Sequence, residues 1–355
     1  RIYSPNSNIY PVTPYYIQFD GIGRYTAATG QNVYTARSFP AAYWNRALFV
    51  NEPTAHLIGR ADLESDGAGY RAQFHYSNFL ASIDEWFAPV HSVTGPDGAV
   101  WVADWYNFIL LHNPALHEKE HGIEAPLGQG AGHINPLRDR EHGRIYRVTW
   151  DRGTPSPVEP LEPHNPASLI AGLRSNNQFW RLHAQRLLVE RKKNDVFPHL
   201  IALTEDMEVD SVGLNNAALH ALWSMAGIGL NAAALQAVEK ALKHPAASVR
   251  KAALMILPAS PETGHIILDA GMVYDKTPHV RLAALLALSR SAQYVAPQVK
   301  ALIKSLTHKP EITADPILSR ALRVLKGENI AQEKTDWLRL KMDSLLRPLK
   351  QWYKR

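Results

Sequence analysis

Two hydrophobic periods divide this sequence. Up to residue 153, short apolar runs and alternating apolar and polar positions are separated by turn residues, and this pattern predicts β-strands. Beyond residue 163, apolar side chains recur at the spacing of a helix face. We therefore expect a multidomain chain, β then α. The predicted strands are residues 47–50, 56–60, 69–74, 89–93, 99–103 and 143–149.

Turn and linker signals separate these patterns. Residues 95–98 read Gly-Pro-Asp-Gly, and proline at the second turn position with Asp-Gly after it favours a tight turn between two predicted strands. Residues 154–163 hold four prolines in ten positions. Because proline neither continues a helix nor pairs inside a sheet, we expect a stiff linker there. It would join the domain at residues 1–153 to a helical domain at residues 164–330.

Four segments of the second half superpose on one another. They begin at positions 180, 214, 249 and 280, which are 34, 35 and 31 residues apart. This spacing fits one helix pair per unit. The second position of the segments holds Arg181, Asn215, Arg250 and Arg281. The pattern predicts a HEAT-type α-solenoid, a stack of helix pairs that buries its core between neighbours. An ordinary helical bundle is the alternative.

Composition narrows the class of protein. The chain has 355 residues, 46% of them hydrophobic and 20% charged, which is typical of a soluble globular protein. It contains no cysteine, which excludes a disulfide scaffold, a thiolate zinc site, an iron–sulfur cluster and a c-type haem attached within this chain. The longest charge-free stretch, residues 211–238, carries polar residues and two central glycines, so we expect two amphipathic helices rather than a membrane span.

The net charge is concentrated near the end of the sequence. Residues 334–355 contain seven basic and two acidic side chains, a balance that equals the +5 of the whole chain. The rest is therefore neutral, which disfavours a nucleic-acid-binding surface. We expect residues 331–355 to form a basic amphipathic helix or tail. It would either cap the last apolar face of the solenoid or dock on a membrane surface or an acidic partner.

Several runs in the first half resemble one protein family. They are residues 84–91 (DEWFAPVH), 95–107 (GPDGAVWVADWYN) and 142–148 (HGRIYRV), with 51–56 (NEPTAH) as a further segment. In this order they are similar to the large membrane-bound dehydrogenases predicted in planctomycete-type bacteria. The β-propeller of that family is similar to that of soluble quinoprotein glucose/sorbosone dehydrogenases. A HEAT-like region follows the propeller, and a c-type haem domain commonly follows that region.

The resemblance implies a fold as well as a family. We expect the terminal blades of a β-propeller followed by a HEAT-type α-solenoid. The predicted strands suffice for about two blades, whereas a closed propeller needs at least about four. Two blades alone would leave unpaired edges and half a core. We therefore expect the remaining blades to come from the parent polypeptide or from another chain.

The resemblance also implies a ligand-binding face. A dehydrogenase of this type needs a base that takes the alcohol proton as hydride leaves, and a histidine titrating near neutrality suits that role. Quinoprotein relatives use a quinone, such as pyrroloquinoline quinone, and a calcium ion; both are implied here by resemblance only. The alternative is that these motifs are structural signals common to propellers. The implied catalytic residues are His91 and Asp104, and the implied cofactor-binding residues are Glu52, His56, Asp84, Trp86, Asn107 and Arg144.

The long connection at residues 108–141 contains a formal H-E-x-x-H motif. On a helix, His117 and His121 would lie on one face as zinc ligands, with Glu118 as general base. The flanking sequence lacks the long apolar stripe of a buried zincin helix and the metzincin extension. We therefore expect a solvated loop, with metal binding by the two histidines as an alternative and a protease as the least supported interpretation.

These observations predict part of an extracytoplasmic, quinoprotein-like dehydrogenase. It would oxidise a sugar or an alcohol and pass the electrons to a cytochrome, with the solenoid docking that electron acceptor. We expect a periplasmic or otherwise extracytoplasmic location, with peripheral attachment to a membrane. The alternative comes from another class of protein: a non-catalytic scaffold subunit of a larger periplasmic or membrane-attached electron-transfer complex.

Overall fold

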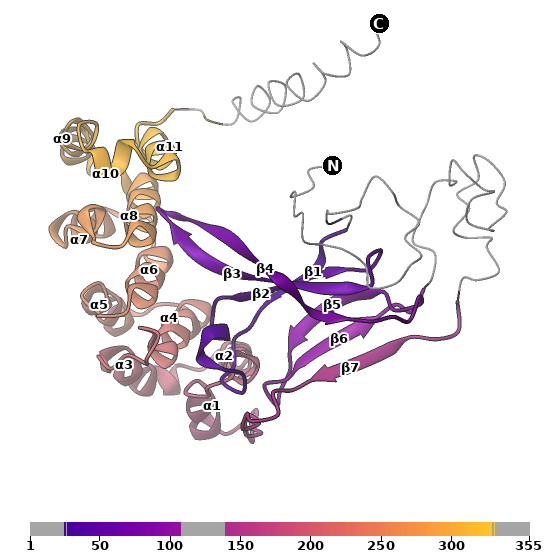
Figure 1. Cartoon of the computed structure of the whole chain (residues 1–355). Coiled ribbons are helices and arrows are strands. Elements are labelled where there is room, and N and C mark those ends of the chain that lie inside the picture. Colours follow the sequence, from indigo (N-terminus) through magenta and orange to yellow (C-terminus); the bar gives the residue numbers. More distant parts are fainter. Residues whose placement is uncertain (1–24, 26, 108–138, 329, 331–355) are drawn as a thin grey trace, which may run out of the picture. The chain divides into compact units, whose positions relative to one another are not determined.

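The computed structural model describes residues 25, 27–107, 139–328 and 330 (Figure 1). The described strands end at residue 148 and the α-helices begin at residue 166, so the predicted order of a β part followed by an α part is confirmed. The chain divides into two compact units: Arg1–Ser65 with Tyr70–Arg191, and Asp66–Gly69 with Lys192–Arg355. The tail predicted at residues 331–355 lies outside the described residues.

The first sheet has four strands, hydrogen-bonded in the order β1 (Thr29–Val33), β2 (Ala47–Glu52), β3 (Leu57–Asp66) and β4 (Gly69–Ala81). Strand β1 was not predicted, because its sequence is mostly polar and contains a glycine. Gly30 has a φ of 50°, and a Cβ there would overlap the carbonyl group of Val90. This close approach of β1 to the second sheet therefore requires glycine.

The second sheet is an antiparallel meander of β5 (Pro89–Thr94), β6 (Val100–Asp104) and β7 (Arg144–Val148). The predicted turn at residues 95–98 is confirmed. The Gly98 N–H donates to the Gly95 carbonyl at 3.0 Å, and Gly98 has a left-handed φ of 79°. Asp97 Oδ1 accepts from the Ala99 N–H at 3.1 Å and from Trp101 Nε1 at 3.0 Å, which fixes the start of β6.

The two sheets share one hydrophobic core. It joins Ala47 and Phe49 of β2 to Val100 and Val102 of β6, and all four side chains are completely or almost completely buried. A buried polar contact crosses the same interface: Asn51 Nδ2 donates to the Gly30 carbonyl at 2.7 Å and to Ser92 Oγ at 3.2 Å. The described strands form these two sheets and do not close into a ring.

The first two helices, α1 (Pro166–Gly172) and α2 (Gln178–Arg191), belong to the unit that contains the sheets. Asn177 lies just before α2 and is fully buried. Its Nδ2 donates to the carbonyls of Gly95 and Pro96 at 2.8 and 3.1 Å, and Trp180 Nε1 donates to the Pro96 carbonyl at 2.8 Å. The secondary structure thus changes across residues 154–163, whereas the division between compact units follows Arg191.

The second unit contains the remaining α-helices. In Figure 1, α4, α6, α8 and α11 follow one another in one row, and α3, α5, α7 and α9 form a second row. No described helix has the length and apolar content needed to cross a membrane. The bounds are α3 (Phe197–Glu205), α4 (Asn216–Ile228), α5 (Ala232–Ala241), α6 (Ala247–Ile256), α7 (Pro261–Asp269), α8 (Pro278–Ser291), α9 (Ala296–Leu306), α10 (Pro310–Thr313) and α11 (Pro316–Leu325), with short 3-10 turns at Ala41–Tyr43, Asn194–Val196 and Met272–Tyr274.

The repeated arginines make the same local contact. Arg181, Arg250 and Arg281 each donate through Nη1 to the carbonyl six positions earlier, at 2.7, 2.8 and 2.9 Å respectively. In the remaining copy, Asn215 Nδ2 donates to the carbonyls of Asp206 and Glu208 at 2.8 and 3.0 Å. The sequence repeat therefore corresponds to a repeated hydrogen bond between the start of a helix and the loop before it.

Replacing Asn177 tests how α2 is held to the β5–β6 turn. We expect Asn177→Ala to lower the free energy of unfolding of the first unit by about 1–3 kcal/mol, because buried carbonyls lose their donor. Denaturant unfolding followed by tryptophan fluorescence would measure it. Asn176→Ala, at the neighbouring exposed asparagine, is the matched control and should stay within about 0.5 kcal/mol. Equal effects of the two variants would contradict the contact.

The buried ion pair of Arg250 and Asp275 offers a second test. Their side chains are 6% and 7% exposed, with Arg250 Nε 2.7 Å from Asp275 Oδ2. We expect Arg250→Met to cost about 3–5 kcal/mol, because it leaves a buried carboxylate without its cation. Lys240→Met, at an exposed pair with Glu205, should change stability by less than about 1 kcal/mol.

The same pair predicts a pH dependence. Burial by itself would raise the pKa of Asp275, but hydrogen bonds from Arg250 and the Thr277 N–H, with the charge of Arg250, lower it below 3.8. The stabilisation is therefore complete above the pKa of the unfolded carboxyl group and is lost as the pH falls through the lower folded value. Unfolding curves of wild type and Arg250→Met should converge only in that acidic range, and convergence near neutral pH would contradict the assignment.

Candidate functional site

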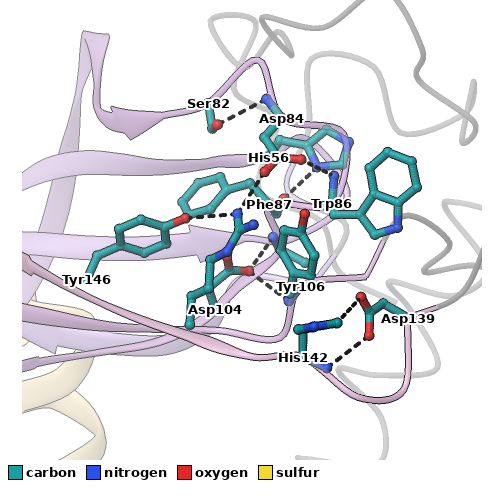
Figure 2. Close-up of polar contacts among 12 residues, drawn as sticks. His56, Ser82, Asp84, Trp86, Phe87, Asp104, Tyr106, Asp139, His142 and Tyr146 are labelled. Atoms are coloured by element: carbon teal, nitrogen blue, oxygen red, sulfur yellow. Dashed lines mark hydrogen bonds and ion pairs between the residues drawn. The ribbon is translucent and has the colours of Figure 1, made fainter.

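Polar and aromatic side chains gather at one end of the second sheet (Figure 2). They come from the β2–β3 turn, from the segment that leads into β5, and from the facing ends of β6 and β7. Of the predicted residues, Figure 2 shows His56, Asp84, Trp86 and Asp104 in this group. Arg144, at the start of β7, pairs with Asp104 across the β6–β7 ladder, which places it in the same group.

Arg144 has polar and aromatic partners. Its Nη1 lies 2.8 Å from Asp84 Oδ2, and its Cζ lies 3.7 Å from the centre of the Tyr106 ring. The hydrogen bond to Asp84, with a further one to Tyr146, raises the pKa of Arg144 above its ordinary value. The side chains of Arg144 and Asp84 are 42% and 34% exposed, so a fixed guanidinium is presented at the surface.

Asp104 lies below this surface and is 4% exposed. Its Oδ1 accepts from the N–H groups of Ala88 and Tyr106, at 2.7 and 2.8 Å. Its Oδ2 is buried and has no hydrogen-bond partner among the described residues. Asp104 therefore holds the backbone on both sides of the site, including Tyr106, whose φ of 53° is left-handed.

His56 is also buried and has a left-handed φ of 55°. Its Nδ1 lies 2.6 Å from the Phe87 carbonyl. Because a carbonyl can only accept, Nδ1 carries a proton, and Nε2 then faces Glu85 Oε2 at 3.8 Å. His56 and Tyr106 are thus two non-glycine residues in the left-handed region at one site, where local strain is characteristic of functional positions.

The other predicted cofactor-binding residues are Glu52, Trp86 and Asn107. Glu52 is fully buried, and its carboxylate accepts from the N–H groups of Ala27 and Thr54, at 3.1 and 3.3 Å. The Trp86 N–H donates to Asp84 Oδ1 at 3.0 Å. Asn107 is fully buried at the end of the described part of this connection.

The structure separates the two predicted catalytic residues. His91 pairs with Ala103 in the β5–β6 ladder, whereas Pro89 pairs with Asp104. Since neighbouring residues of a strand point to opposite faces, His91 lies on the face opposite to Asp104. His91 is exposed, and Asp104 is buried.

His142, the first residue of the 142–148 motif, brings a second imidazole to this site, although it was not among the implied catalytic residues. His142 Nδ1 lies 2.8 Å from Asp139 Oδ2, and the His142 side chain is 68% exposed. Asp139 Oδ1 accepts from the N–H groups of Glu141 and His142, and these two bonds lower the pKa of Asp139. The His142 ring meets the Tyr106 ring edge-on at 6.4 Å. An aspartate three positions before a histidine, just ahead of a predicted strand, was the available signal.

The described residues do not form a metal site and hold few groups that could bind a cofactor. Among them, no group of three or more His, Asp or Glu side chains is placed to hold a metal ion. Within the cluster of Figure 2, Arg144 supplies a guanidinium that Asp84 already neutralises. These residues by themselves do not fit a complete quinone and calcium site. His117 and His121, the predicted metal ligands, lie outside the described residues.

Comparison with known proteins finds similarity to one domain family, in the first half of the chain, and no activity. Residues 3–152 match a family model described as a domain of unknown function (DUF7133). The match spans the seven described strands and the site residues. No curated protein matches the chain.

Replacing Asp104 tests whether its carboxylate stabilises the fold. We expect Asp104→Ala to lower the free energy of unfolding by about 2–4 kcal/mol, because the Ala88 and Tyr106 N–H groups lose their acceptor. Asp104→Asn keeps Oδ1 and should cost less. Asp151→Ala, at an exposed aspartate, is the control and should stay within about 0.5 kcal/mol. Denaturant unfolding measures all three; unchanged stability of Asp104→Ala would contradict this role.

Proposed function

We propose that this chain is part of an extracytoplasmic, quinoprotein-like dehydrogenase that oxidises a sugar or an alcohol and passes the electrons to a cytochrome. Within it, the two sheets are consecutive β-propeller blades, and the helices form a HEAT-type solenoid that docks the electron acceptor. The observation that carries the proposal is the cluster at one end of the second sheet, where five of the residues implied by the family resemblance lie together: His56, Asp84, Trp86, Asp104 and Arg144.

The construction of the sheets supports the assignment of blades. Each sheet follows the chain order of its strands, and the two pack face to face through β2 and β6. Successive meandering sheets packed in this way are how a propeller is built. Further blades would come from the parent polypeptide or from another chain, and they would complete the face that carries the cluster.

The helical region supports a solenoid. Contacts join α4 to α6, α6 to α8 and α8 to α11, so each of these helices packs on the next one in the row. The arginines repeat one hydrogen bond at the start of their helices. A stack of equivalent units with neighbour-to-neighbour contacts is the organisation of a helical-repeat protein and offers an extended docking surface.

This chain would contribute positioning and proton transfer rather than a whole cofactor site. A bound quinone would supply the acceptor for hydride, with its calcium and most of its ligands held by other blades. Arg144, whose charge is already paired with Asp84, would offer the remaining N–H donors of a fixed guanidinium to a ligand. His142, with Nδ1 held by Asp139, leaves Nε2 as an exposed proton acceptor, whereas His91 lies on the other face of its sheet.

A non-catalytic scaffold is the second candidate, and one observation favours it. The buried carboxylates Glu52 and Asp104 are used as acceptors for backbone N–H groups, so their positions follow from folding alone. In that case the same face binds partner subunits of an electron-transfer complex, at a periplasmic or membrane surface.

Steady-state kinetics would distinguish the two candidates. The natural polypeptide that contains this chain would be purified with pyrroloquinoline quinone and calcium and assayed for dye reduction with a panel of sugars and alcohols. We expect substrate-dependent reduction and a decrease in kcat of about 10²–10⁴-fold in His142→Asn, because the proton acceptor is lost.

The control for this assay is His91→Asn, an exposed histidine on the opposite face, which should keep kcat within a factor of about two. Bound quinone without any substrate-dependent reduction, or no quinone binding at all, would favour the scaffold. Equal loss of activity in both variants would contradict the role given to His142.

A further inference from the structure

His56 contacts both ends of the segment between β4 and β5, residues 82–88. Its carbonyl accepts from the Ser82 N–H at 3.2 Å, and its Nδ1 lies 2.6 Å from the Phe87 carbonyl. Its Nε2 lies 3.8 Å from Oε2 of Glu85, in the middle of the segment. One buried residue of the β2–β3 turn therefore contacts the start, the middle and the end of this segment.

The same segment carries Asp84, which binds Arg144. The Asp84 N–H donates to Ser82 Oγ at 3.0 Å, and Asp84 Oδ1 accepts from the Trp86 N–H at 3.0 Å (Figure 2). The other carboxylate oxygen, Oδ2, lies 2.8 Å from Arg144 Nη1. The direction of the Arg144 guanidinium therefore depends on the conformation of residues 82–88.

The contact between His56 and Glu85 brings two acceptors together. The proton of the neutral imidazole is on Nδ1, so Nε2 carries a lone pair, and an ionised carboxylate only accepts. Oε2 of Glu85 is buried and has no hydrogen-bond partner in the described part of the chain. The side chains of His56 and Glu85 are 4% and 16% exposed, so solvent does little to separate the two atoms. A buried carboxylate oxygen without a donor is unfavourable.

A proton on Nε2 would convert this contact into a charge-assisted hydrogen bond. Imidazole is the side chain that ordinarily changes charge between about pH 5 and 8. The other charged or titratable groups at this site are Glu52 on β2, Asp84 on the segment 82–88, Asp104 on β6, Asp139 and His142 before β7, and Arg144 on β7. Among these, the imidazole of His142 has the same ordinary range, so an experiment has to separate it from His56.

We propose that His56 and Glu85 form a proton-dependent positioning pair for Arg144. When Nε2 of His56 is protonated, it binds Glu85 and holds residues 82–88 in the conformation in which Asp84 orients Arg144. When the proton leaves, the pair opens and the guanidinium is no longer held in one direction. For its consequence in ligand binding the inference rests on the proposed function, in which Arg144 is offered to the ligand.

Arginine labelling of the natural polypeptide with phenylglyoxal, read residue by residue by mass spectrometry, measures how firmly Arg144 is held. The exposed Arg152 in the same sample is the reference, since the ratio of two arginines removes the pH dependence of the reagent. We expect the Arg144/Arg152 ratio to rise several-fold from about pH 6 to about pH 8, because the neutral pair no longer holds Asp84 in place. A ratio that stays constant over this range would overturn the proposal.

Two variants separate the pair from His142 and from folding. In Glu85→Gln, the side-chain amide donates to the Nε2 lone pair of neutral His56, so the ratio should stay low at both pH values. In His56→Asn, asparagine tolerates the left-handed φ and its amide replaces Nδ1 as donor to the Phe87 carbonyl, but Nε2 is lost. The ratio should then be high at both pH values.

A matched control keeps the substitution and changes its place. Glu141→Gln, at an exposed glutamate between Asp139 and His142, should follow wild type at both pH values. A purely structural role of His56 predicts that Glu85→Gln also follows wild type, which would overturn the proposal. A pH dependence that persists in both Glu85→Gln and His56→Asn would assign the titration to His142 and would overturn it as well.

These outcomes are separate from those of the dehydrogenase assay, because the labelling reads the position of Arg144 and not the activity. A pH-dependent Arg144 in a polypeptide that does not oxidise any substrate would keep the positioning pair and remove only the proposed activity. An active enzyme whose Arg144 reacts equally at both pH values would keep the activity and remove the positioning pair.

Discussion

The described β unit depends on the packing of two antiparallel sheets against each other. Phe49 of β2 and Val102 of β6 are buried in one core, and burial of such side chains contributes roughly 1.5–3 kcal/mol each. The approach is close enough that β1 needs glycine at position 30, and Asn51 satisfies polar groups across the interface. Because of this packing, the β2–β3 turn lies beside the segment that leads into β5.

This packing brings together the polar side chains of the site, which form a buried layer and a partly exposed layer. Buried side chains hold the backbone: Asp104 and Glu52 accept from main-chain N–H groups, and His56 contacts the Phe87 carbonyl. Above them, Arg144 and His142 are partly exposed, each fixed by one carboxylate. The lower layer therefore holds the fold of the site, whereas the upper layer presents fixed polar groups to solvent.

In the helical part, hydrogen bonds from repeated arginines fix the backbone. Each arginine at the start of a repeated segment donates to a carbonyl of the preceding loop. Arg250 also forms an ion pair with Asp275, which lies in the loop before α8. Such contacts fix the start of each helix relative to the loop before it. The pair Arg250–Asp275 is buried, so its loss costs more than that of the exposed pair Lys240–Glu205.

The sequence by itself determined the order of β and α parts, six of the seven described strands, the turn at residues 95–98 and the helices at the repeated segments, because hydrophobic period and turn chemistry are local properties. It also indicated Asp84 and Arg144, which lie in motifs. Only the tertiary structure decided that β1 is a strand, that α2 packs on the β5–β6 turn, that His91 and Asp104 lie on opposite faces, and that His142 pairs with Asp139. These features depend on strand register and on contacts between distant residues, which a local pattern does not encode.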